Sequence, residues 1–211
     1  VKFCISFPGL TSGAMLYAKQ AIEDKWLGRV TYLRIRAAHG GSSQNWLPAY
    51  WYDAQKAGGG AMMDLGCHPN YQAGYLLGRP KRILSMFNTL CAPDTIEDNA
   101  VSAVEFESGA IGVIETGFVS PYSPSAIEIL GTEGSIIIED GKLRIHSPAV
   151  NPDGWVTPDK LPDPLPAALR QFISGILYDK PISFGLEGAI ALTELLENEY
   201  RAHREQRVVT V

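Results

Sequence analysis

The stretch that decides the fold of this chain is Gly58-Gly59-Gly60-Ala61-Met62-Met63-Asp64-Leu65-Gly66-Cys67-His68-Pro69-Asn70-Tyr71. The three glycines indicate a turn, and the residues after them predict a helix over positions 61–77 that ends at Gly78 and Pro80. Asp64 and His68 are four residues apart on that helix, so they share one face and come within reach of a carboxylate–imidazole hydrogen bond. The spacing therefore predicts an acid/base pair.

The neighbours of this pair add detail to the prediction. A carboxylate at Asp64 favours the imidazolium form of His68 and orients the ring, which tunes a group whose unperturbed pKa is about 6.5. Gly66 inside a helix costs roughly 1 kcal/mol relative to alanine, which indicates that another group approaches the backbone there. Pro69 removes a helical hydrogen bond, so we expect the helix to bend or restart just after His68.

Two other interpretations of these residues stay open. In the first, Asp64 interacts with the helix dipole, His68 is a buried histidine with satisfied hydrogen bonds, and Gly66 is a close packing point. In the second, Asp64 and His68 are metal ligands. The second is weaker because no third or fourth ligand has a recognisable spacing, and His39 is the only other histidine upstream. We predict no metal.

The regions before and after this stretch predict both helices and strands. Residues 1–7 and 29–39 have the texture of strands, residues 12–26 fit an amphipathic helix, and the loop before the glycines contains Trp46, Tyr50 and Trp51. Six further strands are predicted at 83–91, 100–107, 110–119, 125–130, 135–139 and 142–146. Ser108-Gly109 and Asp140-Gly141 fit two-residue hairpin turns, so the strands that they join should be antiparallel.

The end of the chain completes the prediction of the fold. Residues 151–166 are rich in proline and predict an irregular surface segment, helices follow at 166–178 and 185–205, and residues 207–211 fit a last strand. Strands in succession with helices before and after them favour an α+β fold, with a mostly antiparallel, open-faced β-sheet and helices on one face. The other face then needs a second domain or a symmetry mate as cover.

Composition limits the classes of function. The 211 residues are 45% hydrophobic and 19% charged, and no apolar stretch approaches the roughly 18 to 20 residues of a membrane span. A net charge of −5 without a basic stripe argues against nucleic acid as a partner. The first residues do not resemble a signal peptide, and the three cysteines lack the spacing of a disulfide framework, so we expect a cytoplasmic protein.

Ordered matches along almost the whole chain give a family resemblance. The glycine turn, the Asp-x-Gly-x-His helix, the aromatic loop before it and the β-meander after it resemble the C-terminal domain of the Gfo/Idh/MocA oxidoreductases, the glucose-fructose oxidoreductase and inositol dehydrogenase family. Further matches are Lys25-Trp26-Leu27-Gly28-Arg29-Val30, Glu128-Ile129-Leu130-Gly131-Thr132-Glu133-Gly134-Ser135 and the ending Arg207-Val208-Val209.

The resemblance implies an enzyme of two domains. An N-terminal Rossmann domain, absent from this chain, would bind NAD or NADP. Residues 1–211 would form the substrate-binding and oligomerisation domain, with a fold like the C-terminal domains of dihydrodipicolinate reductase and glyceraldehyde-3-phosphate dehydrogenase. We expect a homodimer or homotetramer that forms through the open sheet face.

The resemblance also implies roles for single residues. His68 would be the general acid/base on a hydroxyl of a sugar, sugar derivative or inositol while hydride moves to or from the nicotinamide, and Asp64 would position the substrate and tune His68. Gly66 would lie near the cofactor. The residues expected to line the substrate pocket are Trp46, Tyr50 and Trp51.

Two features depart from the family pattern. The family often has an acidic residue three positions after the histidine, where this chain has Tyr71. No G-x-G-x-x-G follows a strand and opens a helix, so this chain cannot hold a dinucleotide in the Rossmann manner. We therefore expect the substrate-binding half of an NAD(P)-dependent oxidoreductase, inactive as an isolated chain. The alternative is a non-catalytic ligand-sensing or dimerisation module on the same fold.

Overall fold

The structure is a computed structural model that describes residues 1–93 and 95–211. Its longer helices are α1 (Gly13–Glu23), α4 (Cys67–Leu77), α5 (Ala168–Tyr178) and α6 (Leu186–Glu205), and its short ones are η1 (Pro8–Leu10), η2 (Ala49–Tyr52), α2 (Ala54–Ala57) and α3 (Ala61–Asp64). The strands are β1 (Val30–Ala38), β2 (Pro80–Asn88), β3 (Asn99–Phe106), β4 (Ile111–Gly117), β5 (Ala126–Gly131), β6 (Ser135–Glu139), β7 (Lys142–Ser147), β8 (Asn151–Val156) and β9 (Val209–Thr210).

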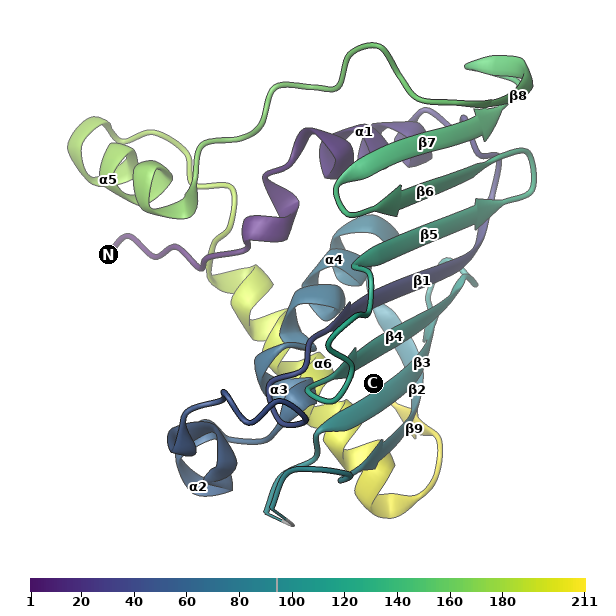
Figure 1. The fold of residues 1–211 in the computed structure, drawn as a ribbon. Coiled ribbons are helices and arrows are strands. Elements are labelled where there is room, and N and C mark those ends of the chain that lie inside the picture. Colours follow the sequence, from purple (N-terminus) through teal and green to yellow (C-terminus); the bar gives the residue numbers. More distant parts are fainter. Residues whose placement is uncertain (94) are drawn as a thin grey trace.

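The described residues form one nine-stranded sheet with the order β8-β7-β6-β5-β1-β4-β3-β2-β9 (Figure 1). β1 pairs in parallel with β4, and the other neighbouring strands are antiparallel, which confirms the prediction of a mostly antiparallel sheet. Both hairpin predictions are confirmed, because β3 pairs with β4 and β6 with β7, and Gly109, Asp140 and Gly141 have the positive φ that such turns need.

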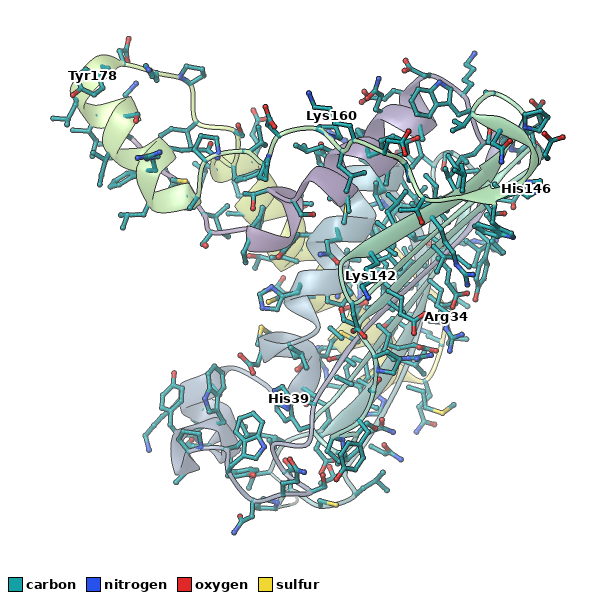
Figure 2. All side chains as sticks on the ribbon, turned by 45° about the horizontal axis from the view of Figure 1, so that its top comes forward. Arg34, His39, Lys142, His146, Lys160 and Tyr178 are labelled. Atoms are coloured by element: carbon teal, nitrogen blue, oxygen red, sulfur yellow. The ribbon has the colours of Figure 1, made fainter. Side chains whose placement is uncertain are left out.

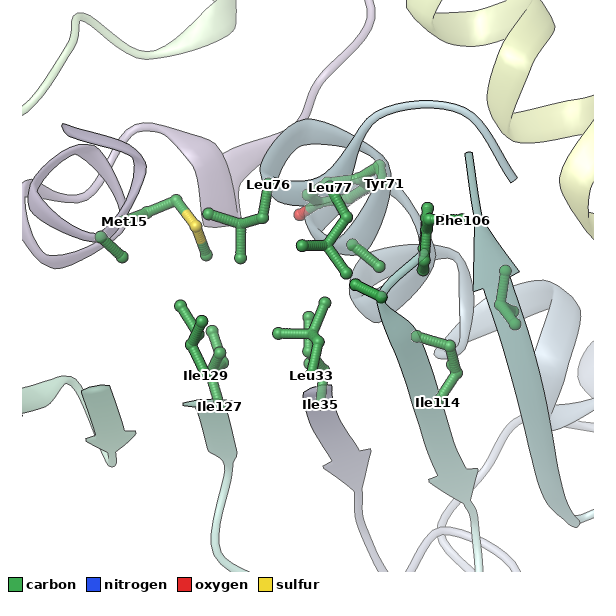
Figure 3. Packing of buried hydrophobic residues seen from close by; sticks show 14 of the residues in the cluster. Met15, Leu33, Ile35, Tyr71, Leu76, Leu77, Phe106, Ile114, Ile127 and Ile129 are labelled. Atoms are coloured by element: carbon green, nitrogen blue, oxygen red, sulfur yellow. The ribbon is translucent and has the colours of Figure 1, made fainter. Parts of the chain in front are cut away.

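Helices cover one face of the sheet and leave the other face open, as the sequence predicts. In Figure 1, α1, α4 and α6 lie along the same side of the sheet, while α5 stands away from it. Figure 3 shows the layer between them: Met15 of α1 and Leu76 of α4 face Ile127 and Ile129 of β5. These four side chains are 8% exposed or less, so this layer is the main core.

Because helices cover only one face, buried and exposed side chains alternate along the strands. On β4, Ile114 is fully buried under the helices, whereas the Ile111 side chain is 49% exposed on the open face. Successive side chains of a strand point to opposite faces, so the same residue type is core at one position and surface three positions earlier.

Two predictions about strands are wrong. Residues 1–7 form no strand; the segment is joined to the rest by the Ile5 N–H, which donates to the Phe184 carbonyl, and a strand needs a whole ladder of such bonds. Conversely, the predicted irregular segment 151–166 begins with β8. Pro152 is tolerated there because β8 lies at the edge of the sheet, where a missing N–H breaks no second ladder.

Candidate active site

The Gly58-Gly59-Gly60 turn packs too tightly for side chains at two of its positions. Gly58 ends α2 with a φ of +81°, in the left-handed region. A Cβ on Gly59 would lie 2.2 Å from the Tyr200 hydroxyl, and one on Gly60 would lie 2.0 Å from the Glu97 carbonyl oxygen. The glycines therefore let the start of α3 approach both β3 and α6.

The helix predicted over residues 61–77 is two helices, and its break lies before His68 rather than after it. α3 ends at Asp64, and α4 starts at Cys67. Gly66 is the junction, where a Cβ would meet the Met62 backbone oxygen at 2.6 Å, so the group that approaches this glycine is the preceding turn of the chain itself. Pro69 is the third residue of α4, in the first turn, where a helix has no intrahelical acceptor for the missing N–H.

The break separates Asp64 from the imidazole that it was expected to bind. Within the described residues, the Asp64 side chain makes no hydrogen bond to His68, so the predicted carboxylate–imidazole bond is wrong. The two groups still interact through their charges. Asp64 is half-buried, and this burial raises the pKa of its carboxyl, against the opposing effects of His39 and then His68.

His68 is bound by Tyr71 instead. Its Nδ1 lies 3.1 Å from the Tyr71 hydroxyl oxygen, which also accepts the Gly9 N–H at 3.0 Å. Burial raises the pKa of Tyr71 to about 12, so the phenol stays protonated at neutral pH. Burial also lowers the pKa of His68, with Asp64 opposing the shift, and the imidazole is held mainly in its neutral form.

Because its partner is a hydroxyl, His68 can adopt either neutral tautomer, with the proton on Nδ1 or on Nε2. A phenol can donate to Nδ1 or accept from it, whereas a carboxylate can only accept. When Nδ1 carries the proton and donates it to the Tyr71 oxygen, the lone pair of Nε2 is free to take a proton from a bound molecule. Tyr71 thus takes the place of the acidic residue expected three positions after the histidine.

A second histidine lies near Asp64, and sequence reasoning did not include it in the site. His39 follows β1 at the end of the sheet nearest α2, where Figure 2 labels it. Its ring stacks on Phe118, with centroids 5.0 Å apart, and its Nδ1 accepts the Gly41 N–H at 3.1 Å. Burial lowers the pKa of His39, and the Asp64 charge opposes this shift, so Asp64 interacts with two imidazoles.

The aromatic loop lies at the same end of the molecule. Trp46 is half-exposed, with its ring 4.8 Å from that of His39, and Trp51 packs against a small cluster of Leu47, Ala61, Ile96 and Phe118. Tyr50 stands edge-on to Trp51, and its hydroxyl donates to the Lys56 carbonyl. The structure therefore brings Trp46 next to His39, while Tyr50 is tied back to α2.

In the described part of the chain, no group of three or more His, Cys, Asp or Glu side chains is arranged to hold an ion. No described helix is both long and apolar enough to cross a membrane.

Fold and site together define a class: an open-faced α+β domain with an acid/base-capable carboxylate on α3 and imidazole on α4, at one end of its sheet. Residues 15–137 match the family model of the GFO/IDH/MocA C-terminal domain, and the chain belongs to this family.

Two curated relatives are similar over part of the chain. The chain is 37% identical over 95 residues to the scyllo-inositol 2-dehydrogenase (NAD(+)) of Bacillus subtilis (strain 168), a match that covers 42% of this chain and 27% of that protein. It is 25% identical over 121 residues to the 1,5-anhydro-D-fructose reductase of Ensifer adhaerens, covering 56% of this chain and 36% of that protein. The matched part thus spans about a quarter of the first relative and about a third of the second.

Solved structures share the fold over the whole chain. Levoglucosan dehydrogenase in complex with NADH superposes with a TM-score of 0.88 and 20% identity, covering 100% of this chain and 66% of that one. An NAD binding oxidoreductase from Klebsiella pneumoniae gives a TM-score of 0.86 and 22% identity, with the same two coverages. This chain is therefore shorter than either of those two chains by about a third.

Proposed function

We propose that this chain is the substrate-binding half of an NAD(P)-dependent oxidoreductase that moves hydride between nicotinamide and a hydroxyl-bearing carbon of a sugar, sugar derivative or inositol. The observation that carries the proposal is the half-buried, neutral His68 imidazole, which is held by Tyr71 and lies within the electrostatic influence of Asp64. A ligand-sensing or dimerisation module would need no group poised for proton transfer.

His68 is the proton-transfer group in this proposal. In the oxidising direction, Nε2 takes the proton of the substrate hydroxyl, and the imidazolium that forms is stabilised by the Asp64 charge and by the Tyr71 oxygen at Nδ1. In the reducing direction, the same imidazolium returns the proton to the carbonyl oxygen. The lowered pKa of His68 favours the neutral base before the oxidising step.

Asp64 and the aromatic side chains serve binding. The Asp64 carboxylate makes no hydrogen bond within the described residues, so its oxygens are available to accept hydrogen bonds from neighbouring hydroxyls of a polyol. Trp46 and Trp51 provide the apolar surfaces on which a sugar ring packs, and Tyr50 extends that surface. Gly66 adds no side chain to the junction of α3 and α4, next to which we place the nicotinamide.

Bound NAD or NADP supplies the hydride acceptor or donor. The chain has no phosphate-binding glycine turn between a strand and a helix, so a further domain has to hold the dinucleotide. One region of this chain suits such a contact: α5 exposes Leu169, Ile173, Ile176, Leu177 and Tyr178, and Figure 2 shows it projecting away from the sheet. An apolar surface of this extent favours burial against another protein surface.

We assign assembly to the open face of the sheet. Large apolar side chains there are exposed between charged ones, namely Leu84, Met86, Val101, Ile111 and Leu130. A second copy stacked on this face would bury them and provide the cover that a two-layer fold requires.

Replacement of His68 tests the catalytic proposal. In the complete oxidoreductase, His68→Ala should lower turnover of a responsive polyol or sugar at least about 100-fold, while NADH or NADPH binding measured by fluorescence stays unchanged. His146→Ala is the matched control, because His146 lies on β7 and packs against Trp155. Turnover that survives in His68→Ala would overturn the assigned role, and a complete protein that binds sugars without reducing any cofactor would indicate the sensor alternative.

A further inference from the structure

Two consecutive residues in the last third of α6 contact both helices of the candidate active site, α3 and α4. Tyr200 contacts the start of α3, which ends in Asp64, and Glu199 contacts α4, which carries His68. Their partners at the site lie 129 residues away in sequence for Glu199 and 140 for Tyr200, so no local motif relates them. We call Glu199 and Tyr200 the α6 anchor.

The contact with α3 runs through Glu97. The Glu97 carboxylate accepts the N–H groups of Gly60, at 3.1 Å, and Met62, at 3.0 Å, and the Glu97 carbonyl accepts the Ala61 N–H at 2.9 Å. One residue outside the helix thereby satisfies three successive amides at its start, which have no intrahelical acceptor. The negative charge also suits the positive end of the helix.

Tyr200 holds Glu97 in that position. Its hydroxyl donates to Glu97 Oε1 at 2.5 Å and accepts the Gly60 N–H at 3.3 Å. The ring is fixed edge-on to Phe87 of β2, with centroids 5.1 Å apart. Because Gly59 has no side chain, the hydroxyl reaches the turn without a clash.

Glu199 makes the second contact. It is fully buried, and its carboxyl accepts the Asn70 side-chain N–H at 2.8 Å. Asn70 is fully buried too, two residues after His68 and one turn from Gly66, whose carbonyl accepts the Asn70 backbone N–H at 3.2 Å. The first turn of α4 is therefore tied to the same part of α6 as the start of α3.

We propose that the α6 anchor and Glu97 are positioning residues that set where Asp64 lies relative to His68 across the break between the two helices. The break removes the rigid connection that one continuous helix would give, so relative placement has to come from outside. This inference rests on the proposed function for its catalytic consequence, although the placement itself is a property of this chain.

Removal of one hydroxyl tests the proposal. Tyr200→Phe keeps the ring against Phe87 but cannot donate to Glu97, and Glu97→Gln places an amide where two N–H groups and the Tyr200 hydroxyl need acceptors. In both variants Asp64 should drift from His68. Since the Asp64 charge raises the pKa of His68, NMR titration of the His68 ring in this chain should show a lower pKa than in the wild type, in the same direction as Asp64→Asn. Tyr71 and Cys67, which also lie beside His68, are unchanged.

Tyr17→Phe is the matched control. It removes the hydroxyl of a buried tyrosine on α1 that packs on Trp26, and the titration of His68 should stay as in the wild type. In the complete oxidoreductase, Tyr200→Phe should lower kcat about tenfold with little change in the KM for cofactor, because small errors of placement slow the chemical step.

An unchanged His68 titration in both Tyr200→Phe and Glu97→Gln would overturn the positioning role, and so would an equal shift in Tyr17→Phe. Turnover of His68→Ala decides the proposed function separately. A His68 titration that moves in the Tyr200 variant supports the positioning role whatever that turnover is.

Discussion

Acidic side chains have different partners on the two faces of the sheet. Under the helices, Glu97 and Glu199 bind amides and a hydroxyl, and neither pairs with a basic side chain among the described residues. On the open face, Glu115 of β4 accepts from Arg34 and Arg36 of β1, and Figure 2 shows Arg34 on that side. The covered face therefore uses carboxyl groups to fix backbone position, whereas the open face uses them to neutralise charge on a surface.

The pKa values follow this difference. Full burial raises the pKa of Glu199 to about 8, with Asn70 and Ser102 opposing the shift. Partial burial also tends to raise the pKa of Glu115. Hydrogen bonds from Arg34 and Arg36 outweigh this effect, so the pKa of Glu115 is below its ordinary value. One residue type thus has opposite shifts on the two faces.

The largest expected effect compares two isoleucines of β4. Ile114→Ala should lower the free energy of unfolding by about 2 to 5 kcal/mol, because it leaves a cavity under the helices. Ile111→Ala, on the open face, should lower it by less than about 1 kcal/mol. Urea denaturation of both variants measures the difference, and equal losses would contradict a one-sided core.

A smaller, pH-dependent effect is expected at Glu199. Between pH 4.5, its ordinary pKa, and about pH 8, the folded state holds a proton that the unfolded state releases, so stability falls as the pH rises through this window. Glu199→Gln has no such proton to lose. From pH 5 to pH 7, its stability should rise relative to the wild type by on the order of 2 kcal/mol.

Glu115→Gln is the matched variant on the open face. Because the folded pKa of Glu115 is lowered, its contribution is present above the ordinary pKa of 4.5 and is lost as the pH falls below it. Urea denaturation across pH 3 to 8 should therefore give the two variants slopes of opposite sign relative to the wild type. Parallel curves for Glu199→Gln and the wild type would rule out a buried, protonated Glu199.

The smallest effect on stability is expected for Met86→Glu on β2. The Met86 side chain is 73% exposed on the open face, so the unfolding free energy of a single chain should change by no more than about 0.5 kcal/mol. Assembly should respond more, since the new charge would be buried against a second copy. Sedimentation equilibrium should give a lower mass for Met86→Glu than for the wild type, and an unchanged mass would exclude this face as the interface.

The sequence predicted the fold class and the helical character of residues 61–77 because both depend on local patterns. Strands with alternating apolar and polar residues, hairpin turns and the glycine-rich turn can each be recognised from residues that are neighbours in sequence. We predicted the helix break at the wrong place because proline disrupts a helix more strongly than glycine. Pro69, however, lies in the first turn of α4, where proline is tolerated. The chain breaks at Gly66, which has no side chain and can pack closely against Met62. The hydrogen bond expected between Asp64 and His68 is absent because that prediction depended on one continuous helix.

What sequence reasoning missed lies far away along the chain. Tyr71 was within reach of inference, since a residue three positions after His68 shares its helical face. His39, Glu97 and the α6 anchor had no such signal, because the strands and α6 bring them to the site only after folding. In the sequence they are ordinary polar residues, and only the packing of α6 and of the strand ends places them near Asp64 and His68.

The parallel pairing of β1 with β4 has a consequence for folding kinetics. It joins Tyr32 to Ile111, and β1 joins Leu33 to Ile129 on its other side, so the central strands close loops of roughly 80 to 100 residues. Contacts of such long range form slowly, and His39 at the end of β1 meets the segment of Asp64 only when they exist. We therefore expect the candidate site to be completed only after these central strands have paired.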